Sequence, residues 1–221
     1  MNASHAREEI CRVGRSLFDR GYVHATAGNI SVRLDDGGLL ITPTDACLGF
    51  LDPGALAHLG PDGQQLSGDR ASKTAVLHRR IYAQALVWDP GTRCIIHTHS
   101  THCVALTLAP CGAELLPPIT PYFVMKVGRV PVVPYHRPGA PEAANEVAEQ
   151  IERHGRAGRP IRAVMLSRLG PTVWQDSPAA AMAVLEELEE TARLACLARA
   201  PLAPLDEVAI DDLRRAFGAR W

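Results

Sequence analysis

Three pairs of short apolar segments, each joined by turn-forming residues, constrain the fold of this chain most strongly. The first pair, "NISVRL" and "LLIT", flanks "DDGG"; the second turns at "PDG" (residues 61–63); the third, "RAVML" and "PTVW", flanks "SRLG". Asp, Gly and Pro supply the backbone conformations that tight turns need, so each pair predicts a β-hairpin. Because hairpin strands are antiparallel, we predict a largely antiparallel sheet rather than a doubly wound nucleotide-binding fold.

Other apolar residues recur at helical spacing and predict helices that cover this sheet. We expect the first helix to begin at a Ser4 cap and to end at Gly21. The second should begin at a Ser72 cap and turn Val76, Leu77 and Ile81 toward the core. Further helices are expected over 141–151, 177–200 and 206–217, and further strands over 93–99 and 130–135. These elements predict one domain over residues 1–221, of the α/β (α+β) class.

Composition excludes several kinds of partner. Apolar residues make up 47 % of the chain and charged residues 21 %, with a net charge of −1, so nucleic acid and anionic membranes are not expected partners. No apolar stretch approaches the roughly 20 residues that span a bilayer, and the N-terminus lacks the pattern of a signal peptide. The six scattered cysteines are typical of reduced residues in a cytoplasmic protein.

Three histidines fall within six positions in "IIHTHSTHC", residues 95–103. His97 and His99 are two apart at the end of a predicted strand, so both imidazoles lie on one face and within reach of one ion. His102 lies one helical turn after His99 and could either join them or point away. The pattern alone is equally compatible with a polar strand end that binds nothing.

Five further motifs give the pair a context. "HATAGNISVR" (24–33), "LLITPTD" (39–45), "SGDRASK" (67–73), "HTHS" (97–100) and "EELEETARL" (186–194) together resemble the class II aldolase/adducin family. Within that family, "LPPITPYFVMKVGRVPVVPY" (116–135) is most similar to the branch that decarboxylates 3-oxo-tetronate 4-phosphates. The resemblance implies a three-layer α/β/α fold and a homotetramer whose active sites lie between subunits.

The resemblance also implies a phosphate site. The positions that bind the substrate phosphate in the family correspond here to Gly28, Asn29, Thr44, Ser72 and Lys73. A glycine permits close backbone approach, while hydroxyl, amide and ammonium groups donate hydrogen bonds to an anion. Taken singly, Gly28–Asn29 is equally typical of a turn and Ser72 of a helix N-cap.

The metal and catalytic positions follow in the same way. The resemblance implies a divalent ion, commonly Zn²⁺ with Mn²⁺ or Co²⁺ as alternatives, on His97 and His99. Tyr122 matches an aromatic position that reaches a neighbouring subunit's site and can donate a proton; packing at an interface is the alternative role. Thr74 stands at the position of the family's acid/base glutamate.

Three positions depart from the family pattern. Leu169 stands where the family has its third metal-binding histidine, Thr74 replaces the glutamate, and Asp45 replaces a glycine of the phosphate loop. A leucine cannot bind a metal, and two protein ligands are fewer than the usual three of a catalytic zinc site. His102, His136 or a neighbouring subunit could supply a third donor.

Decarboxylation of a 3-oxo acid depends less on these positions than aldol cleavage does. The substrate carboxylate is already ionised, so the site must chiefly stabilise the enolate oxygen, whereas aldol cleavage also needs a base. We therefore predict a cytoplasmic, metal-dependent carbon–carbon lyase that decarboxylates a small phosphorylated sugar acid. The alternatives are a family member that has lost catalysis and serves as a binding or structural subunit, and an enzyme shifted to a non-phosphorylated substrate.

Overall fold

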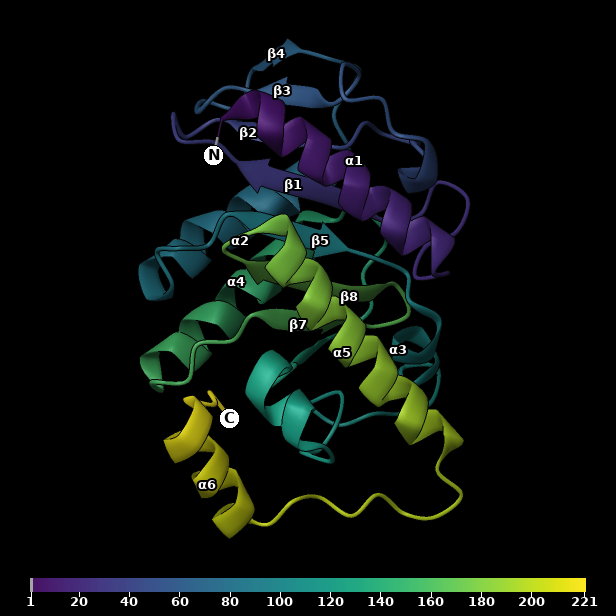
Figure 1. Cartoon of the computed structure of the whole chain (residues 1–221), viewed down its shortest axis with the longest axis vertical. Helices are drawn as coiled ribbons and strands as arrows, with labels where there is room; N and C mark the ends of the chain where they lie inside the picture. Colours follow the sequence, from purple (N-terminus) through teal and green to yellow (C-terminus); the bar gives the residue numbers. More distant parts are fainter. Residues whose placement is uncertain (1) are drawn as a thin grey trace.

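The computed structural model describes residues 2–221 and is built around one eight-stranded sheet (Figure 1). The spatial order of the strands is β4-β3-β2-β1-β5-β8-β7-β6, and all neighbours are antiparallel except β6 and β7. The strands are β1 (Asn29–Arg33), β2 (Leu39–Ile41), β3 (Ala57–Leu59), β4 (Gln65–Ser67), β5 (Cys94–His97), β6 (Val132–Val133), β7 (Ala163–Leu166) and β8 (Gly170–Gln175). The predicted, largely antiparallel sheet is confirmed.

The three predicted hairpins are the pairs β1–β2, β3–β4 and β7–β8. Strand β5 joins two of them, because it pairs with β1 on one side and with β8 on the other. The end of β5 therefore lies beside the start of β1 and the start of β8. This meeting point carries the histidine pair.

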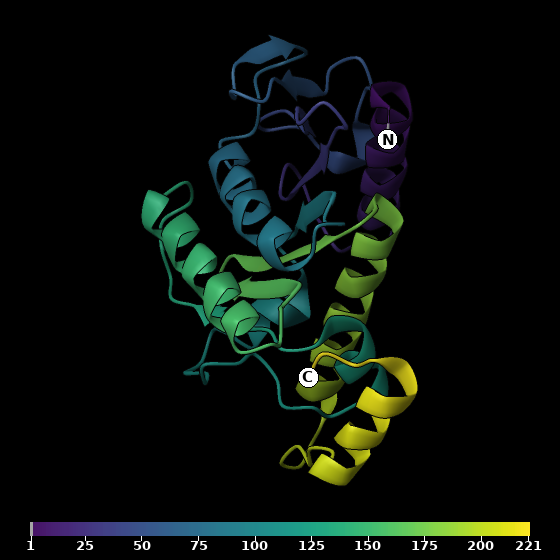
Figure 2. The same ribbon diagram turned by 90° about the vertical axis from the view of Figure 1, so that its left-hand side faces the viewer.

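Helices cover both faces of the sheet and make the fold three-layered (Figure 2). Helices α1 and α5 pack on one face, and α2 and α4 pack on the other; each pair seals its own apolar cluster. The helices are α1 (Ala3–Asp19), α2 (Ala75–Trp88), α3 (Thr101–Ala105), α4 (Pro141–Arg156), α5 (Pro178–Leu197) and α6 (Glu207–Phe217), with a π-helix η2 (Phe123–Val127) and a 3₁₀ turn η1 (Leu48–Phe50). Within residues 2–221, no helix combines the length and apolarity that crossing a membrane requires.

Two local predictions about helix starts are wrong. The cap of α1 is Asn2, whose side-chain oxygen accepts from the His5 N–H at 2.9 Å, and not Ser4, which lies inside the first turn. Helix α2 begins at Ala75, so Ser72 precedes it by three residues. Val76 is 65 % exposed rather than in the core, because the buried face of α2 runs through Ile81 and the residues in register with it.

Candidate active site

His97 is the last residue of β5 and is buried between the two neighbouring strands. It pairs with Asn29 on β1 and with Thr172 on β8. Its Nδ1 lies 3.1 Å from the Pro171 carbonyl oxygen and 2.9 Å from Thr172 Oγ1. With the proton on Nδ1, the ring donates to the carbonyl and leaves Nε2 as a free electron-pair donor.

Burial keeps this imidazole neutral. It lowers the pKa of His97 to about 3, with smaller contributions from His99 and His78. Burial also lowers the pKa of His99, and the nearby His24 adds to the effect. Neutral imidazoles are the form that binds metal ions.

The spacing of the two rings suits a shared ion. The ring centroids of His97 and His99 are 5.2 Å apart, with planes at 71°. Two imidazoles on one tetrahedral ion have centroids about 5 Å apart, given metal–nitrogen distances of about 2.0–2.1 Å. The pair therefore fits a divalent ion in both donor type and spacing.

Two glycines bring other loops against this pair. A Cβ on Gly28 would lie 2.9 Å from the His97 carbonyl oxygen, and one on Gly170 would lie 1.9 Å from that of Thr98. Their φ angles of +87° and +138° also favour glycine. The loop before β1 and the turn between β7 and β8 can approach residues 97–99 this closely only because both positions lack a side chain.

Leu169 occupies the turn between β7 and β8, directly before Gly170. It is partly buried and packs against the apolar cluster on the α2 and α4 face. Across residues 2–221, no three His, Cys, Asp or Glu side chains are already grouped to hold a metal. The two histidines thus fit the ion, but position 169 does not complete their ligand set.

The other two histidines considered as third donors face carboxylates elsewhere. His102 Nδ1 lies 2.8 Å from Glu189 Oε1, and the same carboxylate accepts from the N–H groups of His102 and Cys103 at the start of α3. His136 Nε2 lies 2.9 Å from Glu146 Oε1. Neither ring joins the pair in this structure.

Three segments with predicted phosphate-binding residues meet beside the histidine pair. The Thr42 N–H donates to the Ile30 carbonyl at 3.0 Å, and the Ser72 N–H donates to the Thr42 carbonyl at 3.2 Å. Thr44 is tied to the same segment, because its N–H donates to the Arg70 carbonyl at 2.9 Å. These bonds place Asn29, Thr44 and Ser72 at the same end of the strands as His97.

The polar side chains at this end of the strands differ in exposure. Asn29 is buried, and its Oδ1 has no hydrogen-bond partner in the described part of the chain. Lys73 is exposed, next to the start of α2. Thr74 Oγ1 lies 2.8 Å from Ser72 Oγ, so the residue at the glutamate position is hydrogen-bonded to a neighbouring hydroxyl.

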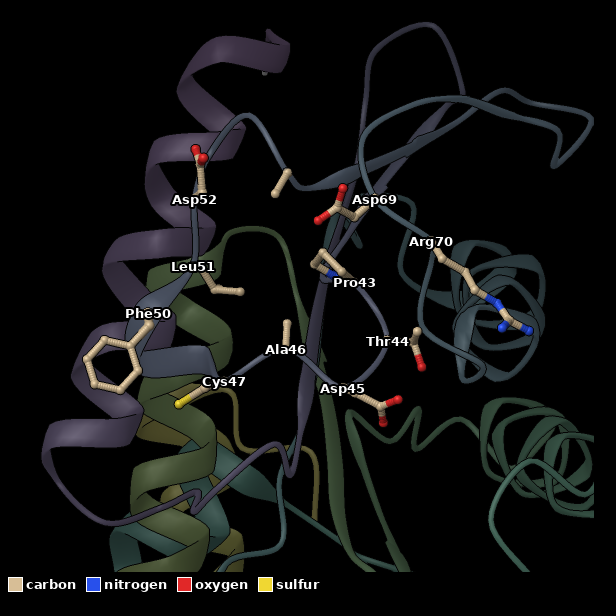
Figure 3. A pocket seen from close by; sticks show the side chains of 11 residues that line it. Pro43, Thr44, Asp45, Ala46, Cys47, Phe50, Leu51, Asp52, Asp69 and Arg70 are labelled. Carbon is tan, nitrogen blue, oxygen red and sulfur yellow. The ribbon is translucent and has the colours of Figure 1, made fainter.

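Asp45 has the backbone that its glycine counterpart would favour. Its φ is +58°, in the left-handed region, which Asp tolerates better than most residues. Its side chain is exposed. Together with Thr44 it lines a pocket of about 400 Å³ between the loop after β2 and residues 69–70, which follow β4 (Figure 3). His97 and His99 do not line this pocket.

Tyr122 lies directly before η2 and is 60 % exposed. The next residue, Phe123, is buried and stacks edge-on against Trp221 at the C-terminus, with ring centroids 5.6 Å apart. The buried neighbour anchors the segment while the tyrosine faces outward.

Comparison with known proteins agrees with this arrangement. Residues 8–196 match the model of the class II aldolase and adducin N-terminal domain. The chain belongs to the class II aldolase and adducin family. It is 51 % identical to a 3-oxo-tetronate 4-phosphate decarboxylase of Cupriavidus necator, over 99 % of this chain and 98 % of that protein.

Solved structures of the class II aldolase family share the fold. The structure of YgbL from Klebsiella pneumoniae, described as a candidate aldolase, epimerase or decarboxylase, superposes with a TM-score of 0.87 at 40 % identity. That alignment covers 97 % of this chain and 100 % of the other. An L-fuculose-1-phosphate aldolase from Thermus thermophilus gives 0.71 at 29 % identity, over 86 % of this chain and 92 % of that one. Enzymes of this class II aldolase type depend on divalent metal ions.

One residue close to the histidine pair, His24, was not predicted from the sequence to lie there. The ring of His24, in the loop before β1, lies 6.4 Å from the ring of His99, centroid to centroid. His24 is the first residue of the motif "HATAGNISVR". Its separation from His99 by 75 positions hid the contact, because only the folded loop brings the two rings together.

Proposed function

We propose that this chain is a carbon–carbon lyase that decarboxylates a 3-oxo-tetronate 4-phosphate or a related phosphorylated sugar acid. The observation that carries the proposal is the pair formed by the buried His97 and the partly buried His99, whose pKa values are both lowered by burial, at the same end of the strands as Asn29, Thr44 and Ser72. The full-length similarity to a decarboxylase supports the choice of reaction.

The residues at this end of the strands suit the two ends of such a substrate. Ser72, Lys73, Thr44, Asn29 and the backbone at Gly28 would bind the phosphate through hydroxyl, ammonium and amide donors. His97 and His99 would hold a divalent ion, with Zn²⁺ as the expected metal and Mn²⁺ or Co²⁺ as alternatives. When bound, such an ion supplies a Lewis acid for the 3-oxo oxygen.

The reaction asks for few protein groups beyond these. The bond between the carboxylate carbon and C2 breaks, its electron pair forms the enolate of the 3-oxo group, and CO₂ leaves. A proton must then return to C2, and Tyr122 is the proposed donor. Thr74 is not a base, but no proton has to be removed before CO₂ departs. The reaction therefore tolerates threonine at the glutamate position.

Metal content and CO₂ release test this proposal. The purified protein should contain a divalent ion, or take up Zn²⁺ or Mn²⁺, and release CO₂ from 3-oxo-tetronate 4-phosphate. His97→Ala should abolish both, whereas His5→Ala, at an exposed position on α1, should leave both intact. Absence of metal and of CO₂ release after Zn²⁺ or Mn²⁺ addition would overturn it.

Leu169 and Thr74 favour a second candidate, a binding or structural subunit without catalysis. Restoring both family residues, by Leu169→His with Thr74→Glu, separates the two. If the double variant gains metal and activity that the natural chain lacks, the natural chain is a catalytically degenerate relative.

Asp45 favours a third candidate, a lyase for non-phosphorylated acids, because a carboxylate beside the phosphate loop repels an anion. Turnover of phosphorylated and free 3-oxo acids distinguishes it from the first. Equal rates would argue against a phosphate site.

We also propose that the chain acts in the cytoplasm as a homo-oligomer, with a tetramer as the expected size. Its six cysteines are unpaired thiols, which a reducing compartment preserves. The exposed Tyr122 would be available to a site on a neighbouring subunit. Light scattering of the purified protein gives the size directly.

A further inference from the structure

The loop that precedes β1 places a third imidazole next to the histidine pair. His24 contacts His99 edge-on, with ring planes at 74° and centroids 6.4 Å apart. His99 in turn contacts His97 at 5.2 Å. The three rings thus form a chain in which His99 is the middle member.

The distances between ring centroids show whether His24, as placed, could share an ion with the pair. Imidazoles on one tetrahedral ion have centroids about 5 Å apart. The His97–His99 spacing meets this value, and the His24–His99 spacing of 6.4 Å exceeds it by roughly 1 Å. As placed, the three rings do not form a complete site, in agreement with the missing three-donor cluster among residues 2–221.

The backbone of His24 is fixed, whereas its side chain is free to move. Its carbonyl accepts from the Ala27 N–H at 2.9 Å, and Gly28 packs against the His97 carbonyl with no space for a side chain. The His24 imidazole itself is exposed. A change of rotamer at an exposed side chain costs little compared with a shift of backbone.

We infer that His24 supplies the third imidazole for a divalent cation on His97 and His99, in place of the side chain that Leu169 cannot provide. This inference rests on the proposed function, because it concerns the ion proposed there. Three nitrogen donors are the usual protein ligand number of catalytic zinc, and they suit borderline cations such as Zn²⁺ and Co²⁺. The set draws on the loop before β1 and on the end of β5, and leaves out the turn between β7 and β8.

Cobalt titration of the metal-free protein tests the inference without any assay of turnover. Co²⁺ reports its ligands through visible d–d absorption, and calorimetry gives the affinity. His24→Ala should weaken Co²⁺ binding roughly 100-fold or more, since loss of even a supporting partner costs about 10- to 100-fold. His136→Ala is the matched control, because that ring faces Glu146 and should leave affinity and spectrum unchanged.

A rescue variant makes the test specific. Adding Leu169→His to His24→Ala should restore the affinity, since it returns a third imidazole beside the pair. Wild-type affinity and spectrum in His24→Ala, with binding lost in His97→Ala, would overturn the inference and leave the two-histidine proposal standing. No cobalt binding by the wild type would overturn both. Circular dichroism confirms that each variant is folded.

Discussion

Two glycines and a buried histidine define the surroundings of the His97–His99 pair at the scale of single residues. Gly28 and Gly170 let two loops approach the backbone of residues 97–99. On α2, His78 is fully buried, with Nδ1 2.7 Å from Ser31 Oγ, and its Nε2 has no partner among residues 2–221. These groups shape the site without being proposed metal ligands.

The Gly170 position should tolerate no side chain. Gly170→Ala would place Cβ 1.9 Å from the Thr98 carbonyl oxygen at a φ of +138°. We expect a loss of roughly 3 kcal/mol or more in the free energy of unfolding, and weaker metal binding, because the strand end must shift. Denaturant unfolding and Co²⁺ titration measure the two effects.

Gly139→Ala is the matched control. Its φ of +80° is similarly unfavourable for alanine, but an added Cβ meets nothing within 4 Å. It should cost only about 1 kcal/mol. Equal losses in the two variants would contradict the importance of the close approach at Gly170.

His78 should make stability depend on pH. Burial lowers its pKa from 6.5 to about 3, so the unfolded chain takes up a proton below pH 6.5 that the folded chain refuses. His78 therefore costs the folded chain no stability above pH 6.5, and the free energy of unfolding falls as the pH drops from 6.5 toward 3. At pH 5 the free energy of unfolding is lower by roughly 2 kcal/mol because of this one residue.

The measurement is the free energy of unfolding at pH 7.5 and pH 5 by urea titration. His78→Gln, which cannot take up the proton, should reduce the pH slope by about one proton between these values. His5→Gln, at an exposed site, should not. An unchanged slope in His78→Gln would show that the imidazole is charged or hydrated in the folded chain.

At the scale of elements, α5 holds the start of α3, the short helix that follows the histidine pair. Glu189 on α5 is buried and accepts from two backbone N–H groups and from the His102 ring. A carboxylate at a helix N-terminus satisfies donors that the helix itself leaves unpaired. The motif "EELEETARL" thus has a structural role in placing the segment after His99.

Glu189→Ala should destabilise the protein by about 2–3 kcal/mol, because buried N–H groups lose their acceptor. The adjacent Glu190 is the control: it forms an exposed ion pair with Arg193 at 3.3 Å, and such pairs contribute about 0–1 kcal/mol. Urea unfolding of both variants gives the comparison. Similar losses would mean that the cap on α3 adds nothing to stability.

At the scale of the whole molecule, the outward position of Tyr122 predicts active sites shared between subunits. Tyr122→Phe and His97→Ala should each be inactive alone. In an equal mixture that exchanges subunits, roughly a quarter of the sites would combine an intact histidine from one chain with an intact tyrosine from the next. The expected CO₂ release is therefore about a quarter of the wild-type rate.

Tyr135→Phe is the control for a change at an exposed tyrosine, since Tyr135 is 57 % exposed, and it should stay active. No recovery on mixing, with subunit exchange verified by mass spectrometry, would place Tyr122 outside the catalytic arrangement or within its own subunit's site.

The sequence by itself determined the hairpins, the histidine pair and its family context. Turn residues and the alternation of side chains along a strand act over a few positions, so "DDGG", "PDG" and "SRLG" were enough to predict the antiparallel sheet. The strand period also predicted that His97 and His99 lie together, and their rings are 5.2 Å apart, although β5 ends at His97 and His99 lies just beyond it. Capping was harder, because Asn2 and Ser4 are both good caps and differ only in where the chain enters the helix.

Only the tertiary structure decided which distant residues join the pair and which do not. It brought His24 to His99 and turned His102 toward Glu189, although His102 is far closer in sequence. The physical reason is that such contacts depend on how loops and helices pack across the sheet, and packing distances are not encoded in any local period. Gly28 and Gly170 permit that packing by leaving space where any side chain would collide.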